Sequence, residues 1–281
     1  MSATIIHADT RDGHRFDVRV CAAQTPSRHL LFFPAMGVAA KYYDRFGAAL
    51  AAQGITVGVA DLRGHGSSSL RAGRATDWGY ETMIQQDWAQ ARLAFAHYTG
   101  AQAISLGGHS LGGQLSCLYA AAYPQQVHSL LLIAACTVEY SGWVGTRAIG
   151  MRYAVRSLMP LVSSLVGYFP GDKLGFAGRE ARTQMHDWAR NIPAGLYHPK
   201  GGPAYEPMLD RLAVPVTAIS MEGDAFAPRA AVENLLRKLP SCSVNHIHMG
   251  TQDGVPAGVL DHFKWAKEAD CVAAVVARHL A

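Results

Sequence analysis

A serine between two glycines is the feature of this sequence with the clearest chemical meaning. Residues 106–113 read LGGHSLGG, so that Ser110 stands two residues after Gly108 and two before Gly112. When a strand precedes it and a helix follows, this pattern forms a nucleophile elbow, a tight turn that exposes the serine hydroxyl at the end of a sheet. The alternative is a turn of small residues that only packs a helix onto a sheet.

The chain on both sides of the motif alternates between strand-like and helix-like segments. Strands are expected at TIIHA, HRFDVRV, HLLFFPA, ITVGVADL, AISLGGHS, VHSLLLIAAC, VPVTAISME and SVNHIHM, the first two as an antiparallel hairpin. Helices are expected at KYYDRFGAALAAQG, YETMIQQDWAQARLAFAHY, LGGQLSCLYAAAYP, PRAAVENLLRKL and KEADCVAAVVARHL. This alternation predicts an α/β fold with a mostly parallel sheet and helices on both faces.

The alternation is interrupted between residues 137 and 205. We therefore predict that residues 1–136 and 206–281 form the core and that residues 137–205 form a helical cap inserted between two strands. Long insertions at the ligand end of a sheet usually shape a pocket, so we expect the cap to contact the substrate; a structural excursion is the alternative. The apolar residues of SLMPLVSSLVGYF, among them Leu158 and Leu165, are expected to meet an acyl chain.

Composition and charge exclude several classes of protein. Of the 281 residues 49% are hydrophobic and 16% charged, which is typical of a globular chain, and the net charge of +4 has no clustered run that would indicate a nucleic-acid partner. The N-terminus lacks the pattern of a signal peptide, so a cytoplasmic location is expected.

Residues 93–138 contain no Asp, Glu, Lys or Arg, but glycines and Pro124 divide them, which favours a buried core over a membrane span. The five cysteines show no CxxC spacing, which favours reduced thiols over a disulfide framework or a zinc site.

Five stretches occur in the order found in the α/β-hydrolase superfamily, which the chain resembles over nearly its whole length. They are FFPAMG (32–37), DLRGHGSS (61–68), GHSLGG (108–113), EGDAFAP (222–228) and DHFKW (261–265). More narrowly, the PAMG start, the stretch LMPLVSSLVGYFPGDKLGF and the length resemble a group of bacterial predicted serine hydrolases of the esterase, lipase and serine aminopeptidase kind.

The resemblance implies a catalytic triad. Ser110 would be the nucleophile, Asp224 the acid and His262 the base, in the chain order that the fold imposes. A serine hydroxyl is a poor nucleophile until an imidazole accepts its proton, and a carboxylate must orient that imidazole. Glu139, after an earlier strand, is the alternative acid.

Other histidines compete for the role of base. Strand alternation points His109 away from the serine, His65 lies on an early loop, and His246 and His248 belong to the last strand, whereas His262 follows that strand. His262 is therefore preferred.

The oxyanion hole is expected to use the backbone N–H groups of Leu111 and Met36. Many family members have His-Gly where this chain has Pro34 and Ala35, which leaves the shape of the loop open. Asp261 stands where glycine commonly precedes the histidine, so a second carboxylate adjoins the base.

These residues predict a serine hydrolase that forms an acyl-enzyme on a small-molecule ester or related acyl substrate with an apolar part. Neither a metal nor an organic cofactor is implied. The elbow carries no aspartate nucleophile, which disfavours the dehalogenase and epoxide-hydrolase branches. Two alternatives stay open: an acyltransferase with the same triad, and a non-catalytic receptor or binding protein that keeps the fold.

Overall fold

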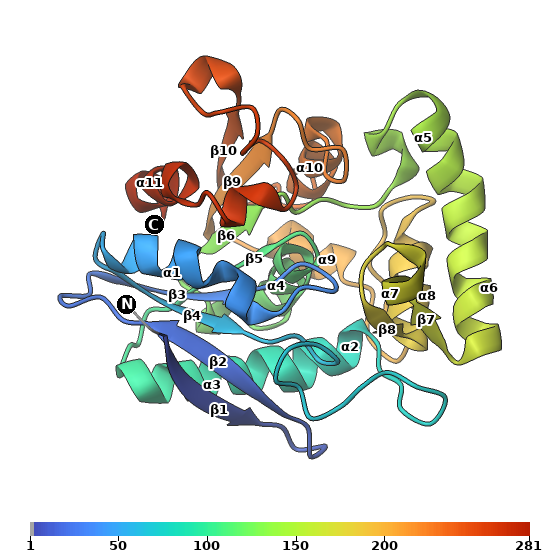
Figure 1. The fold of residues 1–281 in the computed structure, drawn as a ribbon, viewed down its shortest axis with the longest axis horizontal. Coiled ribbons are helices and arrows are strands. Elements are labelled where there is room, and N and C mark those ends of the chain that lie inside the picture. Colours follow the sequence, from blue (N-terminus) through green and yellow to red (C-terminus); the bar gives the residue numbers. More distant parts are fainter. Residues whose placement is uncertain (1–2) are drawn as a thin grey trace.

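An eight-stranded sheet is the centre of the computed structural model, which describes residues 3–281 (Figure 1). Its strands are β1 (Thr4–Asp9), β2 (Arg15–Cys21), β3 (Arg28–Phe33), β4 (Ile55–Ala60), β5 (Ser105–His109), β6 (Leu130–Ile133), β9 (Pro215–Met221) and β10 (Ser243–Met249). Across the sheet they follow the order β1-β2-β4-β3-β5-β6-β9-β10.

The pairing of the strands confirms the predicted architecture. β1 and β2 form an antiparallel hairpin, β2 is antiparallel to β4, and every pair from β4 to β10 is parallel. The chain moves outward from β3 to β4 and then returns to the other side of β3 with β5. Such a reversal of strand order creates a crevice at the carboxyl ends of the strands, and ligands of open α/β sheets bind there.

Helices cover both faces of the sheet. Outside the 137–205 segment they are η1 (Ala40–Tyr43), α1 (Asp44–Ala51), α2 (Tyr80–Thr82), η2 (Met83–Trp88), α3 (Ala89–Thr99), α4 (Leu111–Ala122), η3 (Pro124–Gln126), α9 (Glu206–Arg211), α10 (Arg229–Leu236), η6 (Thr251–Asp253), η7 (Lys264–Ala266) and α11 (Asp270–His279). On one face Phe46 and Leu50, one turn apart on α1, share a hydrophobic core with Val272 and Val276 of α11. Helices α3 and α4 contribute to the core on the other face.

The uncharged stretch of residues 93–138 lies in the middle of the molecule. It contains β5 and β6, whose residues are all buried, and α4, which is buried along nearly its whole length. Strands of a parallel sheet that is covered on both faces need apolar side chains on both sides, which explains the run. In residues 3–281 no helix has both the length and the apolar character needed to cross a membrane.

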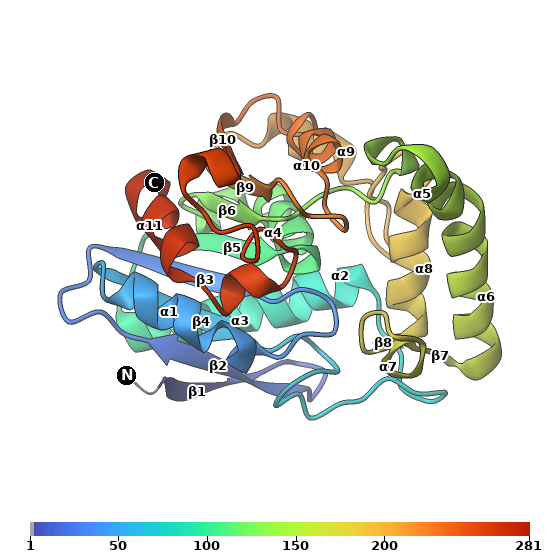
Figure 2. The ribbon, with the colours of Figure 1, turned by 45° about the horizontal axis from the view of Figure 1, so that its top comes forward.

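Residues 137–205 leave the sheet between β6 and β9. Their elements are η4 (Tyr140–Gly142), α5 (Gly145–Ile149), η5 (Gly150–Val155), α6 (Arg156–Val166), β7 (Tyr168–Pro170), α7 (Gly171–Leu174), β8 (Arg179–Ala181) and α8 (Arg182–Asn191). The π-helical segment η5 joins α5 and α6 into one long helical rod. Figure 2 shows α5, α6 and α8 grouped at one end of the sheet. The segment is largely helical and also contains a small antiparallel β7–β8 pair. That residues 137–205 form a separate cap stays a prediction.

Candidate active site

The turn at Ser110 connects β5 to α4 and has an uncommon backbone conformation. Ser110 has φ 53° and ψ −115°, which a non-glycine residue adopts only under strain. A Cβ atom on Gly108 would lie 2.2 Å from the carbonyl carbon of Gly112, and one on Gly112 would lie 2.2 Å from the carbonyl oxygen of Phe33. Neither position has room for a side chain, which explains why glycines flank the serine at this spacing.

Asp224 and His262 come together although 38 positions separate them in the sequence. His262 Nδ1 donates a hydrogen bond of 2.7 Å to Asp224 Oδ2, and both side chains are buried. The other carboxylate oxygen, Oδ1, accepts hydrogen bonds of 2.8 Å from the N–H groups of Phe226 and Ala227. The carboxylate is therefore held on both oxygens, and it fixes the proton of the imidazole on Nδ1, so that Nε2 is the ring nitrogen with a free lone pair.

The loops that carry these two residues pack directly against each other. A Cβ on Gly223 would lie 2.4 Å from the carbonyl oxygen of Leu260. Only glycine allows this approach of the loop after β9 to the loop that carries His262. Close backbone contact therefore holds the carboxylate and the imidazole within hydrogen-bonding distance.

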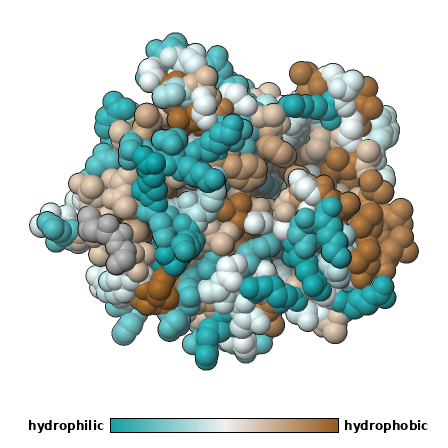
Figure 3. All heavy atoms as spheres, in the orientation of Figure 1, coloured by the Kyte–Doolittle hydropathy of each residue, from teal (hydrophilic) through white to brown (hydrophobic). Residues whose placement is uncertain are grey.

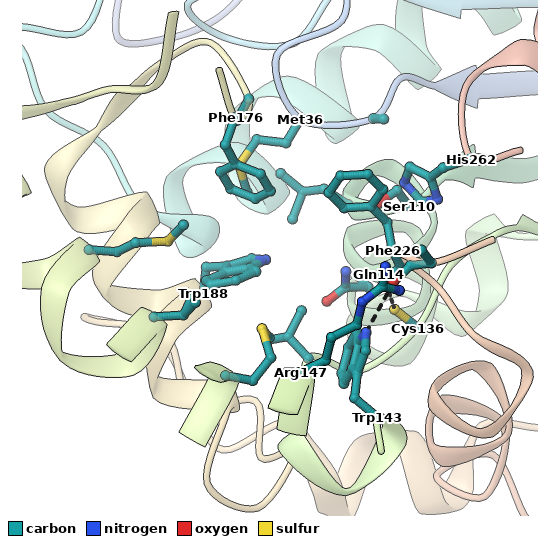
Figure 4. Close-up of a pocket in the computed structure, with 18 of the residues that line it drawn as sticks. Met36, Ser110, Gln114, Cys136, Trp143, Arg147, Phe176, Trp188, Phe226 and His262 are labelled. Carbon is teal, nitrogen blue, oxygen red and sulfur yellow. Dashed lines mark hydrogen bonds between the residues drawn. The ribbon is translucent and has the colours of Figure 1, made fainter. Parts of the chain in front are cut away.

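Ser110 and His262 line the same cavity of about 580 Å³. Figure 4 draws their side chains at the same end of it. The lining is mainly apolar: Met36, Val138, Trp143, Met151, Val155, Met159, Phe176, Trp188, Phe226 and Phe263 contribute, together with the polar side chains of Gln114 and Arg147. The cavity therefore offers an apolar chamber next to a serine and a histidine.

The two predicted oxyanion donors belong to residues that line the same cavity as the serine. Leu111 is the first residue of α4, so its N–H has no acceptor inside the helix and lies at the positive end of the helix dipole. The N–H of Ala35 donates to Tyr43 Oη at 3.0 Å and is therefore occupied. The N–H of the next residue, Met36, has no acceptor among residues 3–281 and is a free donor of this loop. Both Met36 and Leu111 line the cavity.

The competing residues lie elsewhere. His246 and His248 both hydrogen-bond Ser220 Oγ, at 2.8 Å each. His65 lies 3.0 Å from the carboxylate of Glu180. Glu139 accepts a hydrogen bond of 2.8 Å from Ser141. None of these four side chains lines the cavity.

Asp261 makes contacts of its own beside the histidine. Its Oδ1 accepts hydrogen bonds from the N–H groups of Phe263, at 3.0 Å, and Lys264, at 3.2 Å. Burial raises the pKa of Asp261, but these two bonds, together with the charges of Lys264 and His262, outweigh it and hold the pKa below the usual value. Asp261 therefore stabilises the turn of the His262 loop.

The structure adds a supporting residue that the sequence did not reveal. His109 is fully buried, its Nδ1 lies 2.8 Å from Tyr43 Oη, and its ring centroid lies 4.6 Å from that of His262. Burial and the neighbouring His262 lower its pKa well below the usual value, so it is neutral and accepts the proton of Tyr43. Strand alternation correctly keeps His109 out of the cavity, but it gives no sign of the contact with His262. Tyr43 thus links the loop of Ala35 to the packing behind the imidazole.

Two leucines of the insertion do not lie where the sequence placed them. Leu158 and Leu165 are 56% and 68% exposed and do not line the cavity. Met151, Val155 and Met159 line it instead. The segment therefore lines the cavity through residues other than these two leucines. Apolar residues occur on more than one side of α6, so the sequence pattern does not say which side faces inward.

Comparison with known proteins agrees with this architecture. Similar solved structures include a hydrolase from Pseudomonas aeruginosa PA01 (TM-score 0.64, 18% identity, 99% of this chain and 98% of that one). An esterase domain of a Rhodothermus marinus protein (TM-score 0.61, 17% identity) covers 100% of both chains. The enol-lactonase from Burkholderia xenovorans LB400 (TM-score 0.59, 18% identity) covers 98% of this chain and 99% of that one. No curated protein matches the sequence.

The fold is that of the α/β-hydrolases, and the chain is a hydrolase of this type. Residues 24–182, more than half of the chain, match the family described as serine aminopeptidase, S33, and the protein belongs to that family.

Proposed function

We propose that this hydrolase cleaves carboxylic esters with an apolar acyl part through a covalent acyl-enzyme on Ser110. The observation that carries the proposal is the 2.7 Å hydrogen bond between Asp224 and His262 at the end of the cavity that also contains Ser110. A carboxylate, an imidazole and a serine on a strained turn are the groups that nucleophilic acyl transfer needs.

In the proposed reaction Ser110 is the nucleophile and His262 transfers the protons. His262 Nε2 accepts the proton of Ser110 as the serine oxygen attacks the ester carbonyl, and Asp224 stabilises the resulting imidazolium. The N–H groups of Leu111 and Met36 donate to the oxyanion of the tetrahedral intermediate. His262 then gives its proton to the departing alcohol, and water, activated by the same imidazole, releases the acid and restores the serine.

The lining of the cavity supports an apolar acyl group. Its walls are side chains of Met, Val, Trp and Phe, and its volume of about 580 Å³ is in the range of small-molecule sites. An apolar chain gains about 0.8 kcal/mol for each methylene that it buries. The names of two similar structures, an esterase domain and an enol-lactonase, agree with an ester substrate.

Labelling with a fluorophosphonate tests the nucleophile. The probe phosphonylates an activated serine and leaves an ordinary one unmodified. We expect intact-mass measurement to show one adduct on the wild type and none on Ser110→Ala. Ser164→Ala is the matched control, because Ser164 also lies 3.0 Å from a histidine, His186, but on α6 and outside the cavity. An adduct that persists in Ser110→Ala, or disappears in Ser164→Ala, would contradict the assignment.

A further inference from the structure

The outer side of α6 presents leucines to solvent. Leu158, Leu161 and Leu165, called here the cap leucine face, are each more than half exposed and lie three and four positions apart, on one side of the helix. A different side of the helical rod points inward, where Val155 and Met159 line the cavity. The helix is therefore apolar on two sides, and the cavity accounts for only one of them.

The exposed apolar surface continues along the rod. Val144, Ile149 and Tyr153 are also more than half exposed, and they precede the cap leucine face in the chain. Figure 3 shows brown side chains gathered over α6 at the right-hand edge of the molecule. Exposed leucines scattered singly are ordinary, but a continuous apolar patch marks an interaction site.

The charges around this surface have one sign. From Tyr140 to Gly171 the chain contains neither aspartate nor glutamate; of its three arginines, Arg152 and Arg156 are exposed outside the cavity, and Arg147 lines the cavity. A fourth cation, Arg74 of the core, donates a hydrogen bond of 3.3 Å to the carbonyl oxygen of Leu165 at the end of α6. Asp172 and Lys173, just beyond this stretch, cancel each other. The partner of this face must therefore accept leucine side chains and carry negative charge.

We propose that the cap leucine face docks on an anionic lipid surface. Leucine side chains enter the boundary between headgroups and acyl chains, while arginines remain at the level of the phosphates. A second copy of the chain fits less well, because a two-fold interface brings the same patch of both subunits together and would set arginines against arginines. The proposal concerns where the enzyme binds and does not depend on the reaction at Ser110.

Vesicle flotation tests the proposal. The protein carries Ser110→Ala throughout, so that no lipid is cleaved during the measurement. We expect it to float with vesicles of equal parts phosphatidylglycerol and phosphatidylcholine, and to bind vesicles of phosphatidylcholine alone at least tenfold more weakly. Replacement of Leu158, Leu161 and Leu165 by Gln should lower partitioning by at least about tenfold, because the apolar contact is lost. Leu93→Gln is the matched control, an equally exposed leucine on α3, and should leave binding unchanged.

A second variant tests the charges without changing the leucines. Arg152→Gln with Arg156→Gln should weaken binding to the anionic vesicles by about 25-fold, since each surface cation contributes about fivefold. Circular dichroism of the leucine variant shows that its fold is intact. The proposal is overturned if the wild-type surface does not bind anionic vesicles, or if either set of replacements leaves binding unchanged. It is also overturned if sedimentation without lipid shows a dimer that the leucine replacements dissociate.

Discussion

The turn at Ser110 and the helical rod of the insertion differ in how closely their backbones are packed. A Cβ on Gly108 would overlap the backbone of the following helix at 2.2 Å, whereas Cβ atoms on Gly145 and Gly150 of the rod would have no neighbour within 4 Å. The burial of the residues differs between the two regions in the same way. Every residue of β5 is buried, but on α6 only Ser163 is.

The contrast suggests different roles for the two regions: the closely packed core holds the reacting groups, and the less closely packed rod determines which substrate fits. Close backbone contacts at Gly108, Gly112 and Gly223 fix the positions of the groups that would react. The rod contributes mainly side chains to the wall of the cavity, and there is open space around its backbone at Gly145 and Gly150. Its side chains can therefore change without disturbing the core. Changes in the core should therefore abolish the reaction, and changes in the insertion should redirect it.

The largest effect should follow from loss of the imidazole. We expect His262→Ala to lower kcat for a small ester by at least about a thousandfold, because the serine then has no base. His248→Ala is the control, since this histidine hydrogen-bonds Ser220 between β9 and β10 and lies outside the cavity. Steady-state kinetics with circular dichroism on both variants measures the effect. An active His262→Ala variant beside an inactive His248→Ala variant would mean that the base is wrongly assigned.

The space around two glycines predicts the next largest effect, which is on the free energy of unfolding. Gly108→Ala should lower the free energy of unfolding by about 3 kcal/mol, because the new methyl group overlaps the backbone of α4. Gly150→Ala should raise it by about 0.5–1 kcal/mol, because alanine suits a helix better than glycine and nothing lies near. Denaturant titration measures both changes. Equal effects of the two replacements would remove the contrast between the regions.

Much of the core could be predicted from the sequence because its signals are local. The apolar runs of the strands and the glycines around Ser110 predict the sheet and the elbow. The meeting of Asp224 with His262 follows from the resemblance to the α/β-hydrolases, and the hydrogen bond between these two residues is present.

Other features depend on packing that no local pattern records. His109 contacts His262 only because the loop after β10 folds back over β5, and Tyr43 reaches both Ala35 and His109 from η1. The sequence could not show which side of α6 faces the cavity, because its leucines and methionines are equally apolar. The orientation of the rod decides the matter: Met159 lies inward and Leu158 outward.

The two sides of the rod predict a smaller effect on substrate choice. Met159→Trp should shorten the preferred acyl chain, because the larger side chain fills part of the cavity. If it removes room for two methylenes, kcat/KM for long straight-chain esters should fall about 15-fold, at about 0.8 kcal/mol each, with acetyl esters unaffected. Leu158→Trp, on the exposed side, should leave the profile of kcat/KM against chain length unchanged. A shift caused by Leu158→Trp instead would place the acyl chain on the outer side of α6.

The smallest effect concerns the pH dependence of the contact between core and insertion. His65 of the core lies 3.0 Å from the buried carboxylate of Glu180 in β8. Glu180 is held further by the N–H of Gly178 and by Gln184. Burial lowers the pKa of His65, but the Glu180 carboxylate more than offsets this, and the pKa lies above the usual histidine value of 6.5. The charged pair therefore forms at low pH and is lost when the histidine deprotonates.

The sign of the pH effect follows from this raised pKa. The stabilisation by His65 is fully present below its unfolded pKa of about 6.5 and disappears as pH rises through the higher folded value. His65→Gln keeps a hydrogen-bond donor without a charge that titrates. The Tm of the wild type minus that of His65→Gln should therefore be largest below about pH 6 and should shrink as pH rises, by about 2–4 °C for each kcal/mol of stabilisation that is lost. Differential scanning fluorimetry in a series of buffers measures it. A difference that is constant with pH, or that grows as pH rises, would show that this histidine is neutral in the folded protein and that the contact between the two regions is not an ion pair.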